Sequence, residues 1–380
     1  MSCPVSPVIA VLADFPVHRL PGFESTREQH HATWLPILAK ALQTRCHGYS
    51  FHWVTFTKAT DCYRRLEAWG QIFHLLPRRR LSIEMLTGFL RERREIAALL
   101  RSIQPEIVHA WGTEQGYGLA ANDFPGPSLL SIQGILTAYC RNAPMPMLVK
   151  VQARHERRVL RRMGEITVES DWGKRQVSSL APEASIDLLE YGVDPDCFEV
   201  SRSPSRTPLA LAVGSLSVLK GTDTLFNAFR DRRLAHIELV VLGDGDPEFS
   251  EAADLPGNVR LMGFVSPEEV RKWMSRAWCL VHPTRADTSP NCVKEARVIG
   301  LPVVTTPNGG QTQYIVDGQS GIVHEAGDTE GLIHGVLAVT KDLETSFRMG
   351  KQGQSKCRGV LSPANTANNL LQVYRALLGY

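Results

Sequence analysis

Short apolar runs alternate with amphipathic stretches along most of the chain. In the first half, helical periodicity lies within residues 24–46 and over roughly 145–163. The runs between them have strand length and read PVIAVLAD, SFHWVTF, EIVHAWG, PSLLSIQG, EITVES and SIDLLEY. Near-continuous apolar strands that alternate with helices are typical of parallel sheets covered on both faces. The pattern therefore predicts a doubly wound α/β domain.

The second half starts the same alternation again. Its strand-like runs are LALAVGS, IELVVLGDG, NVRLMGF, WCLVHPT and PVVTTP. The segment 192–208, GVDPDCFEVSRSPSRTP, is rich in Pro, Ser and charge, as interdomain linkers are. A chain of 380 residues is also long for a single core. We therefore predict two Rossmann-like domains, 1–195 and 205–362, followed by a terminal helix over 363–380.

Composition narrows the class of protein. With 43% hydrophobic and 21% charged residues, the chain is typical of soluble globular proteins. Its start, MSCPVSPVIAVLADF, indicates a first strand and lacks the features of a signal peptide, so we expect a cytoplasmic protein. The eight cysteines form no C-x-x-C pair, which argues against a disulfide framework or a structural zinc site. A formal charge of +3 is too small to indicate that the protein binds nucleic acid.

Positive charge is concentrated in the first half. Residues 1–190 hold 23 Lys/Arg against 18 Asp/Glu, whereas the remainder holds 19 against 21. The basic residues cluster in two helical patterns, 78–101 and 153–165. Solvated helix faces are the simpler interpretation. The alternative is peripheral contact with an anionic membrane, at its inner face, or with an acidic acceptor.

The segment 282–310 contains an acidic residue at an unexpected position. Ser289 is the expected N-cap of a helix with Pro290 at its first position, and Gly300 follows its end. On a helical wheel Glu295 falls within the apolar arc, with Lys294 and Arg297 opposite. A carboxylate on a buried stripe is costly unless a partner satisfies it. Together with Asp287, eight residues earlier, it indicates a binding site for a ligand with hydroxyl groups.

Four loops after strands of the second half carry unusual residues. They are VGSLSVLKG (213–221), LGDGDPE (242–248), HPTRADTSPN (282–291) and TPNGGQTQ (306–313). Ligands of doubly wound sheets bind outside the carboxyl ends of the strands. Glycines allow close backbone approach, and Lys220 together with a helix start can hold phosphate oxygens. The loops therefore predict a phosphate-containing ligand.

These loops carry a family resemblance. The second half resembles the nucleotide-sugar domain of glycosyltransferase family 4, retaining enzymes of the GT-B fold, also called glycosyl transferases group 1. The similar segments are V-G-x-L-x-x-x-K-G at 213–221, G-D-G at 243–245, VRLMGFVSPEEV, DTSPNCVKE and ARVIGLPVVTTPNGG. The first half resembles the family more loosely at 106–121, 128–136 and 190–198. The resemblance implies two Rossmann-like domains that face a cleft, with the last helix packing back across both.

The resemblance also implies roles for particular residues. Lys220 would neutralise the leaving diphosphate, Asp287 would contact hydroxyls of the donor sugar, and Glu295 would bind the ribose. The other implied donor-binding positions are Gly22, Gly214, Ser215, Gly243, Gly245, Phe264, Ser289, Pro290 and Asn291. No metal or other cofactor is expected, because the lysine and helix amides would supply the positive charge. The implied partners are a nucleotide-sugar donor and a carbohydrate or lipid-linked acceptor.

The sequence departs from the family pattern at several of these positions. Asp287 stands where Glu is usual, and Ser215 replaces a common phosphate-binding Arg, for which Arg285 is a substitute candidate. Gln133 stands where many members have a His close to the reacting sugar. Because Gln cannot act as a base, His109 becomes the nearest imidazole to nominate, although a histidine at the end of a buried strand is often a core residue.

These departures leave alternatives to a retaining transferase. One is a catalytically degenerate GT-B protein that binds a nucleotide sugar, and another is a sugar-nucleotide epimerase, for which no acid/base set is evident. The pair Asp244 and Asp246 suggests a metal site, but it lies in a glycine turn and the resemblance requires no metal. The nucleobase, the sugar, the acceptor and the oligomeric state are not readable from the sequence.

Overall fold

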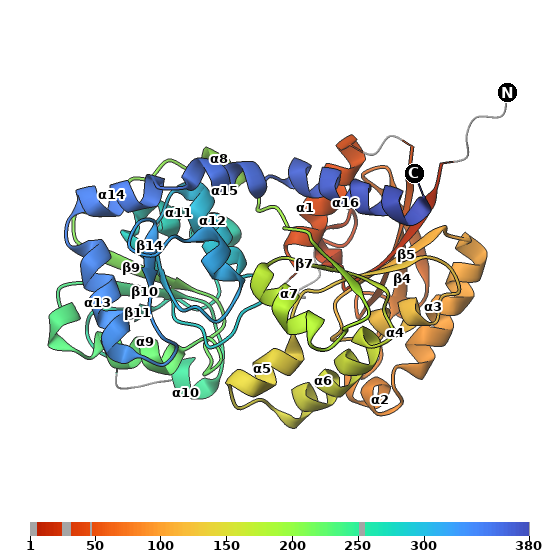
Figure 1. Ribbon diagram of the computed structural model, residues 1–380, viewed down its shortest axis with the longest axis horizontal. Helices are drawn as coiled ribbons and strands as arrows, with labels where there is room; N and C mark the ends of the chain where they lie inside the picture. The colour runs from red at the N-terminus through yellow and green to blue at the C-terminus, as the bar shows by residue number, and fades with distance from the viewer. Residues whose placement is uncertain (1–5, 25–31, 46–47, 251–254, 380) are drawn as a thin grey trace. The chain divides into compact units, whose positions relative to one another are not determined.

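The chain folds into two α/β units in a computed structural model (Figure 1). The structure describes residues 6–24, 32–45, 48–250 and 255–379. The first unit comprises Met1–Cys140, Met145–Gly192 and Pro363–Tyr380, and the second comprises Arg141–Pro144 and Val193–Ser362. Each unit is described separately below.

An eight-stranded sheet forms the centre of the first unit. Its strands, in spatial order, are β3 (Arg64–Ala68), β4 (Gln71–Pro77), β2 (Ser50–Thr57), β1 (Val8–Leu12), β5 (Ile107–Trp111), β6 (Ser128–Ser131), β7 (Glu165–Val168) and β8 (Ser185–Leu188). All neighbours pair in parallel except β3, which pairs antiparallel with β4. The strand order reverses between β1 and β5, the point where ligands bind in doubly wound sheets.

Helices cover both faces of this sheet. They are α1 (Trp34–Arg45), α2 (Leu81–Leu86), α3 (Leu90–Ile103), α4 (Tyr117–Asn122), α5 (Leu136–Asn142), α6 (Met147–Leu160), α7 (Asp171–Ser178) and α16 (Pro363–Leu378). The predicted helix over roughly 145–163 is confirmed as α6. The β3–β4 hairpin was not predicted, because β3 is an exposed edge strand whose residues Arg64, Arg65 and Glu67 break the apolar pattern.

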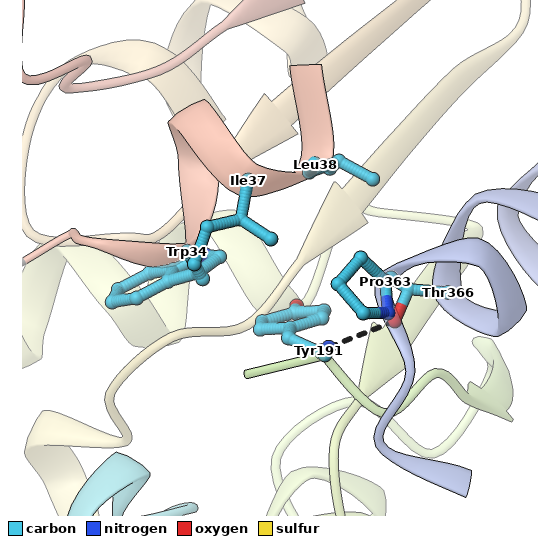
Figure 2. Close-up of a pocket in the computed structure, with 7 residues that line it drawn as sticks. Trp34, Ile37, Leu38, Tyr191, Pro363 and Thr366 are labelled. Atoms are coloured by element: carbon cyan, nitrogen blue, oxygen red, sulfur yellow. Dashed lines mark hydrogen bonds between the residues drawn. The ribbon is translucent and has the colours of Figure 1, made fainter. Parts of the chain in front are cut away.

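The last helix, α16, belongs to the first unit although it comes last in the chain. It lies along α1 (Figure 1), and Leu370, Leu371 and Tyr374 enter the same buried cluster as β1 and β2. Figure 2 shows a small hollow between α1 and α16, where the Thr366 hydroxyl accepts a hydrogen bond from the Gly192 N–H at 2.8 Å. Its volume of about 10 Å³ has room for at most one water, so it is a packing gap and not a substrate site.

A six-stranded parallel sheet forms the centre of the second unit. In spatial order its strands are β11 (Val259–Leu261), β10 (Glu238–Leu242), β9 (Leu209–Val213), β12 (Cys279–His282), β13 (Val303–Thr305) and β14 (Gly321–Val323). In chain order within the unit this is 3-2-1-4-5-6, the order of dinucleotide-binding Rossmann domains. The prediction of two doubly wound parallel sheets is thus confirmed. The direction of the chain across the sheet reverses between β9 and β12.

Helices pack on both faces of this second sheet as well. They are α8 (Asp196–Glu199), α9 (Thr222–Phe229), α10 (Pro247–Ser250), α11 (Pro267–Arg276), α12 (Asn291–Ile299), α13 (Thr329–Thr340), α14 (Leu343–Lys351) and α15 (Gln354–Val360). In the part of the chain that the structure describes, no helix is long and apolar enough to cross a membrane.

The helix that carries Glu295 differs from its prediction at the start and on one face. Pro290 is the N-cap of α12, not its first residue, and Ser289 precedes the cap. Lys294 and Arg297 lie opposite the apolar arc on the helical wheel, yet both are fully buried. The Arg297 guanidinium donates to backbone carbonyls of neighbouring segments, including Tyr314 at 3.2 Å. Because α8, α15 and other segments pack around α12, the face opposite the apolar arc is not solvent.

Candidate functional site

Two loops meet where the strand order of the second sheet reverses. Lys220 lies in the loop after β9, and Asp287 lies in the loop after β12, the strand next to it. The Lys220 ammonium donates to Asp287 Oδ2. The lysine side chain keeps 28% exposure, whereas that of the aspartate keeps 10%. The two sequence-predicted residues, 67 positions apart, thus form one ion pair at the crevice typical of ligand binding.

The loops that hold this pair are fixed to each other by backbone hydrogen bonds. The Leu219 carbonyl accepts from the Arg285 N–H at 2.8 Å and from the Thr284 hydroxyl at 3.1 Å. On the other side, the Gly310 N–H donates to the Asp287 carbonyl at 3.0 Å. Asp287 itself bridges to Gly309 in the glycine-rich loop after β13. The position of the Asp287 carboxylate is therefore set by three loops.

Electrostatics keep Asp287 ionised. Burial opposes its charge, but the attraction of Lys220 and a contact with His282 more than offset this, and the pKa of Asp287 lies well below its usual range. His282, the last residue of β12, places Nε2 3.3 Å from Asp287 Oδ2. Burial lowers the pKa of His282, so the imidazole is neutral near pH 7. At neutral pH Asp287 can accept hydrogen bonds but cannot donate a proton.

Glu295 lies on α12, one helical turn after the first residue of that helix, Asn291. The side chain is half-buried, and within the described residues no donor forms a hydrogen bond to its carboxylate. Burial raises its pKa to about 7, with Lys294 opposing the shift and Asp194 adding to it. A purely structural role, with the carboxylate bonded to a neighbouring loop, is not favoured by this geometry. A half-buried carboxylate without a partner is instead suited to bind hydroxyl groups of a ligand.

The start of α12 offers further polar groups beside the ion pair. The Ser289 hydroxyl is buried and has no hydrogen-bond partner among the described residues. Asn291 is the first residue of the helix, and the first bonds to the Pro290 carbonyl come from the Val293 and Lys294 N–H groups. The N–H groups that precede them point toward the loops, where a helix N-terminus favours negative charge.

The glycines of the two neighbouring loops play different parts. Gly214 and Ser215 are exposed, and a side chain at Gly214, where φ is 135°, would meet open space. A Cβ at Gly243 would instead lie 2.0 Å from the Gly214 carbonyl oxygen, and one at Gly245 2.0 Å from that of Leu216. Gly243 and Gly245 therefore allow the loops after β9 and β10 to pack on each other, a reason for glycine that does not require a ligand.

Phe264, which follows β11, is the remaining residue of this unit that was predicted to bind the nucleotide-sugar donor. Its side chain is 64% exposed, so it is accessible and lacks a packing role. Arg285 does not fit its prediction as a free second cation. Its guanidinium forms two 2.7 Å hydrogen bonds to the Asp223 carboxylate and donates to the Val218 carbonyl. Arg285 is therefore paired with Asp223, as Lys220 is paired with Asp287.

In the first unit, His109 was nominated for the site, and the structure contradicts that role. The imidazole is fully buried on β5, with Nδ1 2.6 Å from the Tyr374 hydroxyl and Nε2 2.7 Å from the Ser131 hydroxyl. Burial lowers the pKa of His109 to about 3. Both nitrogens are occupied and no solvent reaches them, so His109 is a core residue that ties α16 to the sheet.

Gln133 has a more accessible position, in the loop after β6. It is half-buried, and its Nε2 finds no partner among the described residues. Nearby, Glu114 Oε1 accepts from the Gly134 N–H at 3.2 Å, and burial raises the pKa of Glu114 to about 7. At Gly22, in the loop after β1, an added side chain would meet open space. The loops of this edge thus offer both donors and acceptors.

Sequence reasoning missed several polar residues that the fold brings together. His282 carries a signal that could have been used, because it ends a buried strand directly before the Asp287 loop. In the first unit, Asp14 forms a 2.5 Å ion pair with Arg78 and accepts from Gln115 Nε2 at 2.7 Å. These three residues come from the carboxyl ends of β1, β4 and β5, so only the strand order makes them neighbours.

Comparison with known proteins finds a family match within the second unit. Residues 207–342 match the family described as glycosyl transferases group 1. A curated relative, the lipopolysaccharide core biosynthesis glycosyltransferase LpsE of Rhizobium meliloti (strain 1021), is 26% identical over 176 residues, which cover 45% of this chain and 51% of that protein. The chain thus spans about half the length of this relative. The matched segment contains Lys220, Asp287 and Glu295.

Similarity to solved structures extends over the whole chain. Sucrose-phosphate synthase from Thermosynechococcus elongatus superposes with a TM-score of 0.81 at 16% identity, covering 98% of this chain and 99% of that one. Anabaena HepE in complex with UDP superposes with a TM-score of 0.69 at 12% identity, covering 97% and 99%. At such identities the likeness establishes the fold, and the GT-B architecture predicted from the sequence is confirmed.

Proposed function

We propose that this chain is a retaining, metal-independent glycosyltransferase that moves a sugar from a nucleotide-diphosphate sugar to a glycan, lipid-linked or small-molecule acceptor. The observation that carries the proposal is the Lys220–Asp287 ion pair at the reversal point of the second sheet, inside the segment that matches glycosyl transferases group 1. Glu295, to which no described residue donates a hydrogen bond, lies on α12, one turn after its start. These three residues are suited to three parts of one donor: diphosphate, sugar and ribose.

Lys220 supplies the electrostatic stabilisation of the leaving group. As the bond to the sugar breaks, negative charge grows on the diphosphate, and a partly exposed ammonium held in place by Asp287 can meet it without rearrangement. The N–H groups of Asn291 and Cys292 at the start of α12, which have no hydrogen-bond acceptor among the described residues, add hydrogen-bond donors. Because these groups carry the positive charge, the proposed reaction requires no divalent cation.

Asp287 acts as a fixed acceptor of hydrogen bonds from donor-sugar hydroxyls. Its depressed pKa excludes it as an acid, and its negative charge favours a sugar that becomes positive in the transition state. No protein base is nominated, since His109 is buried and Gln133 cannot take a proton. We therefore propose that the bond from the anomeric carbon to the diphosphate breaks while the acceptor oxygen bonds to that carbon on the same face. The leaving phosphate takes the proton of the acceptor hydroxyl, and the anomeric configuration is retained.

The acceptor is proposed to bind to the first unit. The unpartnered amide of Gln133 and the carboxyl group of Glu114 offer a donor and an acceptor to a polyhydroxylated molecule. The role of LpsE in lipopolysaccharide core biosynthesis supports a glycan acceptor for this chain. The complex of HepE with UDP makes uridine diphosphate the first nucleotide to test.

The experiment is thermal unfolding of the purified protein with UDP, GDP, ADP or TDP, without metal and then with Mg²⁺. We expect one nucleotide to stabilise the protein without metal, by roughly 2.7 kcal/mol at a hundredfold excess over Kd. The shift should vanish in Glu295→Ala and persist in the control Glu344→Ala, an exposed glutamate in the first turn of α14. Absence of a shift with every nucleotide, or a shift that depends on Mg²⁺, would contradict the proposal.

A further inference from the structure

Exposed apolar side chains gather at one place on the first unit. The described part of the chain has eleven exposed large apolar residues, and five of them lie on α2, at the start of α3 or in the first turn of α6. They are Ile83 (57% exposed), Leu86 (85%), Leu90 (43%), Met147 (70%) and Leu148 (46%). Scattered exposed apolar residues need no explanation, but such a concentration is typical of a surface that contacts another body.

The two helices that carry most of these residues pack against each other. Nε2 of His155 on α6 lies 3.1 Å from the Met85 carbonyl oxygen on α2, and the His155 ring meets Phe89 edge to face at 5.7 Å. Met147 precedes His155 by two turns, about 12 Å along the helix. Figure 1 shows α2 and α6 side by side in the first unit. We call the exposed side of α2 and α6 the α2–α6 face.

The charge of this face is entirely positive. Arg79 and Arg80 are exposed directly before α2, and α6 exposes Lys150, Arg154, Arg157 and Arg158. The acidic residue of α2, Glu84, is 4% exposed, and that of α6, Glu156, is fully buried. Glu156 accepts from the Leu136 and Thr137 N–H groups at 2.9 and 2.7 Å and therefore faces inward. No other acid lies between residues 124 and 164.

We propose that the α2–α6 face docks onto the surface of a lipid bilayer that contains anionic lipids. Aliphatic side chains that project from a basic helical surface insert at the boundary between headgroups and acyl chains, while the cations bind the anionic headgroups. Anionic lipid satisfies both features at once. A nucleic acid would engage the cations but leave Leu86 and Met147 in water, and a protein partner would require no such one-sided charge.

This docking is independent of the proposed transfer reaction, because it involves neither Lys220, Asp287 nor Glu295. Its consequence for such a reaction is local concentration. An enzyme held on a membrane through the unit that binds the acceptor meets lipid-linked acceptors at the surface that carries them. A water-soluble acceptor would gain nothing from the arrangement.

The first test is flotation of the full chain with vesicles of phosphatidylcholine alone and of phosphatidylcholine with phosphatidylglycerol in equal parts. We expect flotation with the mixed vesicles only, and weaker flotation at 0.5 M salt than at 0.1 M, because salt screens the charges. Equal binding to both vesicle types, or no flotation with either, would overturn the proposal.

Variants separate the two contributions of the face. The double variant Leu86→Asp with Met147→Asp should lower the partition coefficient at least tenfold, since it removes two inserting side chains and adds negative charge. Arg79→Ala with Arg154→Ala should lower it roughly fivefold for each cation removed. The matched controls, Leu343→Asp and Lys272→Ala, replace exposed residues of the second unit and should leave flotation unchanged.

A folding defect is excluded by a second measurement. All the positions changed are on the surface, so the variants should keep the thermal unfolding midpoint of the wild type within about 3 °C. Flotation that survives the α2–α6 variants but is lost in Leu343→Asp or Lys272→Ala would place the contact elsewhere and reject the face. Binding to single-stranded RNA tighter than to mixed vesicles would also reject lipid as the occupant.

Discussion

At the scale of single residues, the candidate site depends on a few groups whose surroundings set their charge. Lys220 keeps Asp287 ionised, and burial raises the pKa of Glu295 to about 7. His109, an imidazole that sequence reasoning nominated, is excluded by its two buried hydrogen bonds. A residue type alone therefore does not decide a role. The depth of the side chain and its hydrogen-bond partners do.

Replacement of Lys220 tests the electrostatic contribution to transfer. We expect Lys220→Ala to lower kcat by about 10²–10³, because it removes a preorganised positive charge from the site of developing negative charge. The control Lys272→Ala removes an exposed lysine of α11 and should change kcat less than twofold. The measurement is steady-state turnover with the nucleotide sugar identified by thermal unfolding. Unchanged turnover in Lys220→Ala would disprove its role.

Replacement of Glu295 tests its ionisation through stability. Burial raises its pKa from 4.5 to about 7 in the folded protein, so the folded state binds the proton more tightly than the unfolded state. Its contribution to the free energy of unfolding is full below pH 4.5 and is lost as the pH rises through 7.

Glu295→Gln keeps the shape and removes the charge, so we expect it to be more stable than the wild type at pH 8 and similar at pH 4.5. Urea unfolding at the two pH values measures the difference. The exposed control Glu248→Gln should have the same free energy of unfolding as the wild type at both pH values. A Glu295→Gln protein that loses stability at pH 8 would indicate that the carboxylate has a structural partner.

At the scale of elements, α16 is joined to the sheet of the first unit by a buried polar contact. The Tyr374 hydroxyl lies 2.6 Å from His109 Nδ1, and the other imidazole nitrogen reaches Ser131, whose hydroxyl lies 2.6 Å from that of Thr167. The chain of contacts crosses from α16 through β5 and β6 to β7. Such a buried network is stable only when every group in it has a partner.

Removal of one hydroxyl from this network should therefore lower the free energy of unfolding by more than removal of a hydrogen bond at the surface. We expect Tyr374→Phe to lower the free energy of unfolding of the first unit by about 1–3 kcal/mol, because a buried imidazole nitrogen is left without its partner. Urea unfolding followed by tryptophan fluorescence measures it. Tyr49→Phe, at a half-buried tyrosine beside Phe51, is the matched control. A change below 0.5 kcal/mol in Tyr374→Phe would show that the bond contributes little.

At the scale of the whole molecule, the order of the chain does not follow the division into units. Apart from Arg141–Pro144, which belong to the second unit, the chain leaves the first unit after Gly192, forms the second, and returns with α16 to complete the first. The core of the first unit contains Leu370, Leu371 and Tyr374 as well as strands from residues 8–57. The stability of the first unit therefore depends on the last residues of the chain.

Truncation after Ser362 tests this dependence. Each large buried side chain of α16 contributes roughly 1.5–3 kcal/mol, and three of them approach the whole stability of a domain, about 5–15 kcal/mol. We expect the first unit to become sensitive to protease while the second keeps its nucleotide-dependent stabilisation. Limited proteolysis with mass spectrometry of the fragments distinguishes the units. The full-length variant Asn368→Ala, at an exposed position of α16, should have no effect, and a resistant first unit in the truncated chain would contradict the dependence.

The sequence by itself determined the class of fold and most of the strands. β1, β5, β9 and β12 are near-continuous apolar runs, and burial on both faces of a parallel sheet imposes that pattern whatever the surroundings. The loops with Lys220 and Asp287 could be found because loops at the carboxyl ends of such strands face ligands. Glu295 could be found because it interrupts the apolar arc of the helix that follows. The strand β3 could not be predicted from the sequence, since a polar edge strand is stabilised by its pairing with β4 and not by burial.

Only the tertiary structure decided which of these groups meet. Lys220 and Asp287 are neighbours because β12 lies beside β9, although two other strands intervene in the chain. Arg285 forms an ion pair with Asp223. Arg297 can be buried because carbonyl groups more than 50 residues away accept its hydrogen bonds. A periodic pattern reports how each segment divides its residues between core and solvent. It carries no information about partners that distant segments supply, and those partners set the charge and access of every site residue.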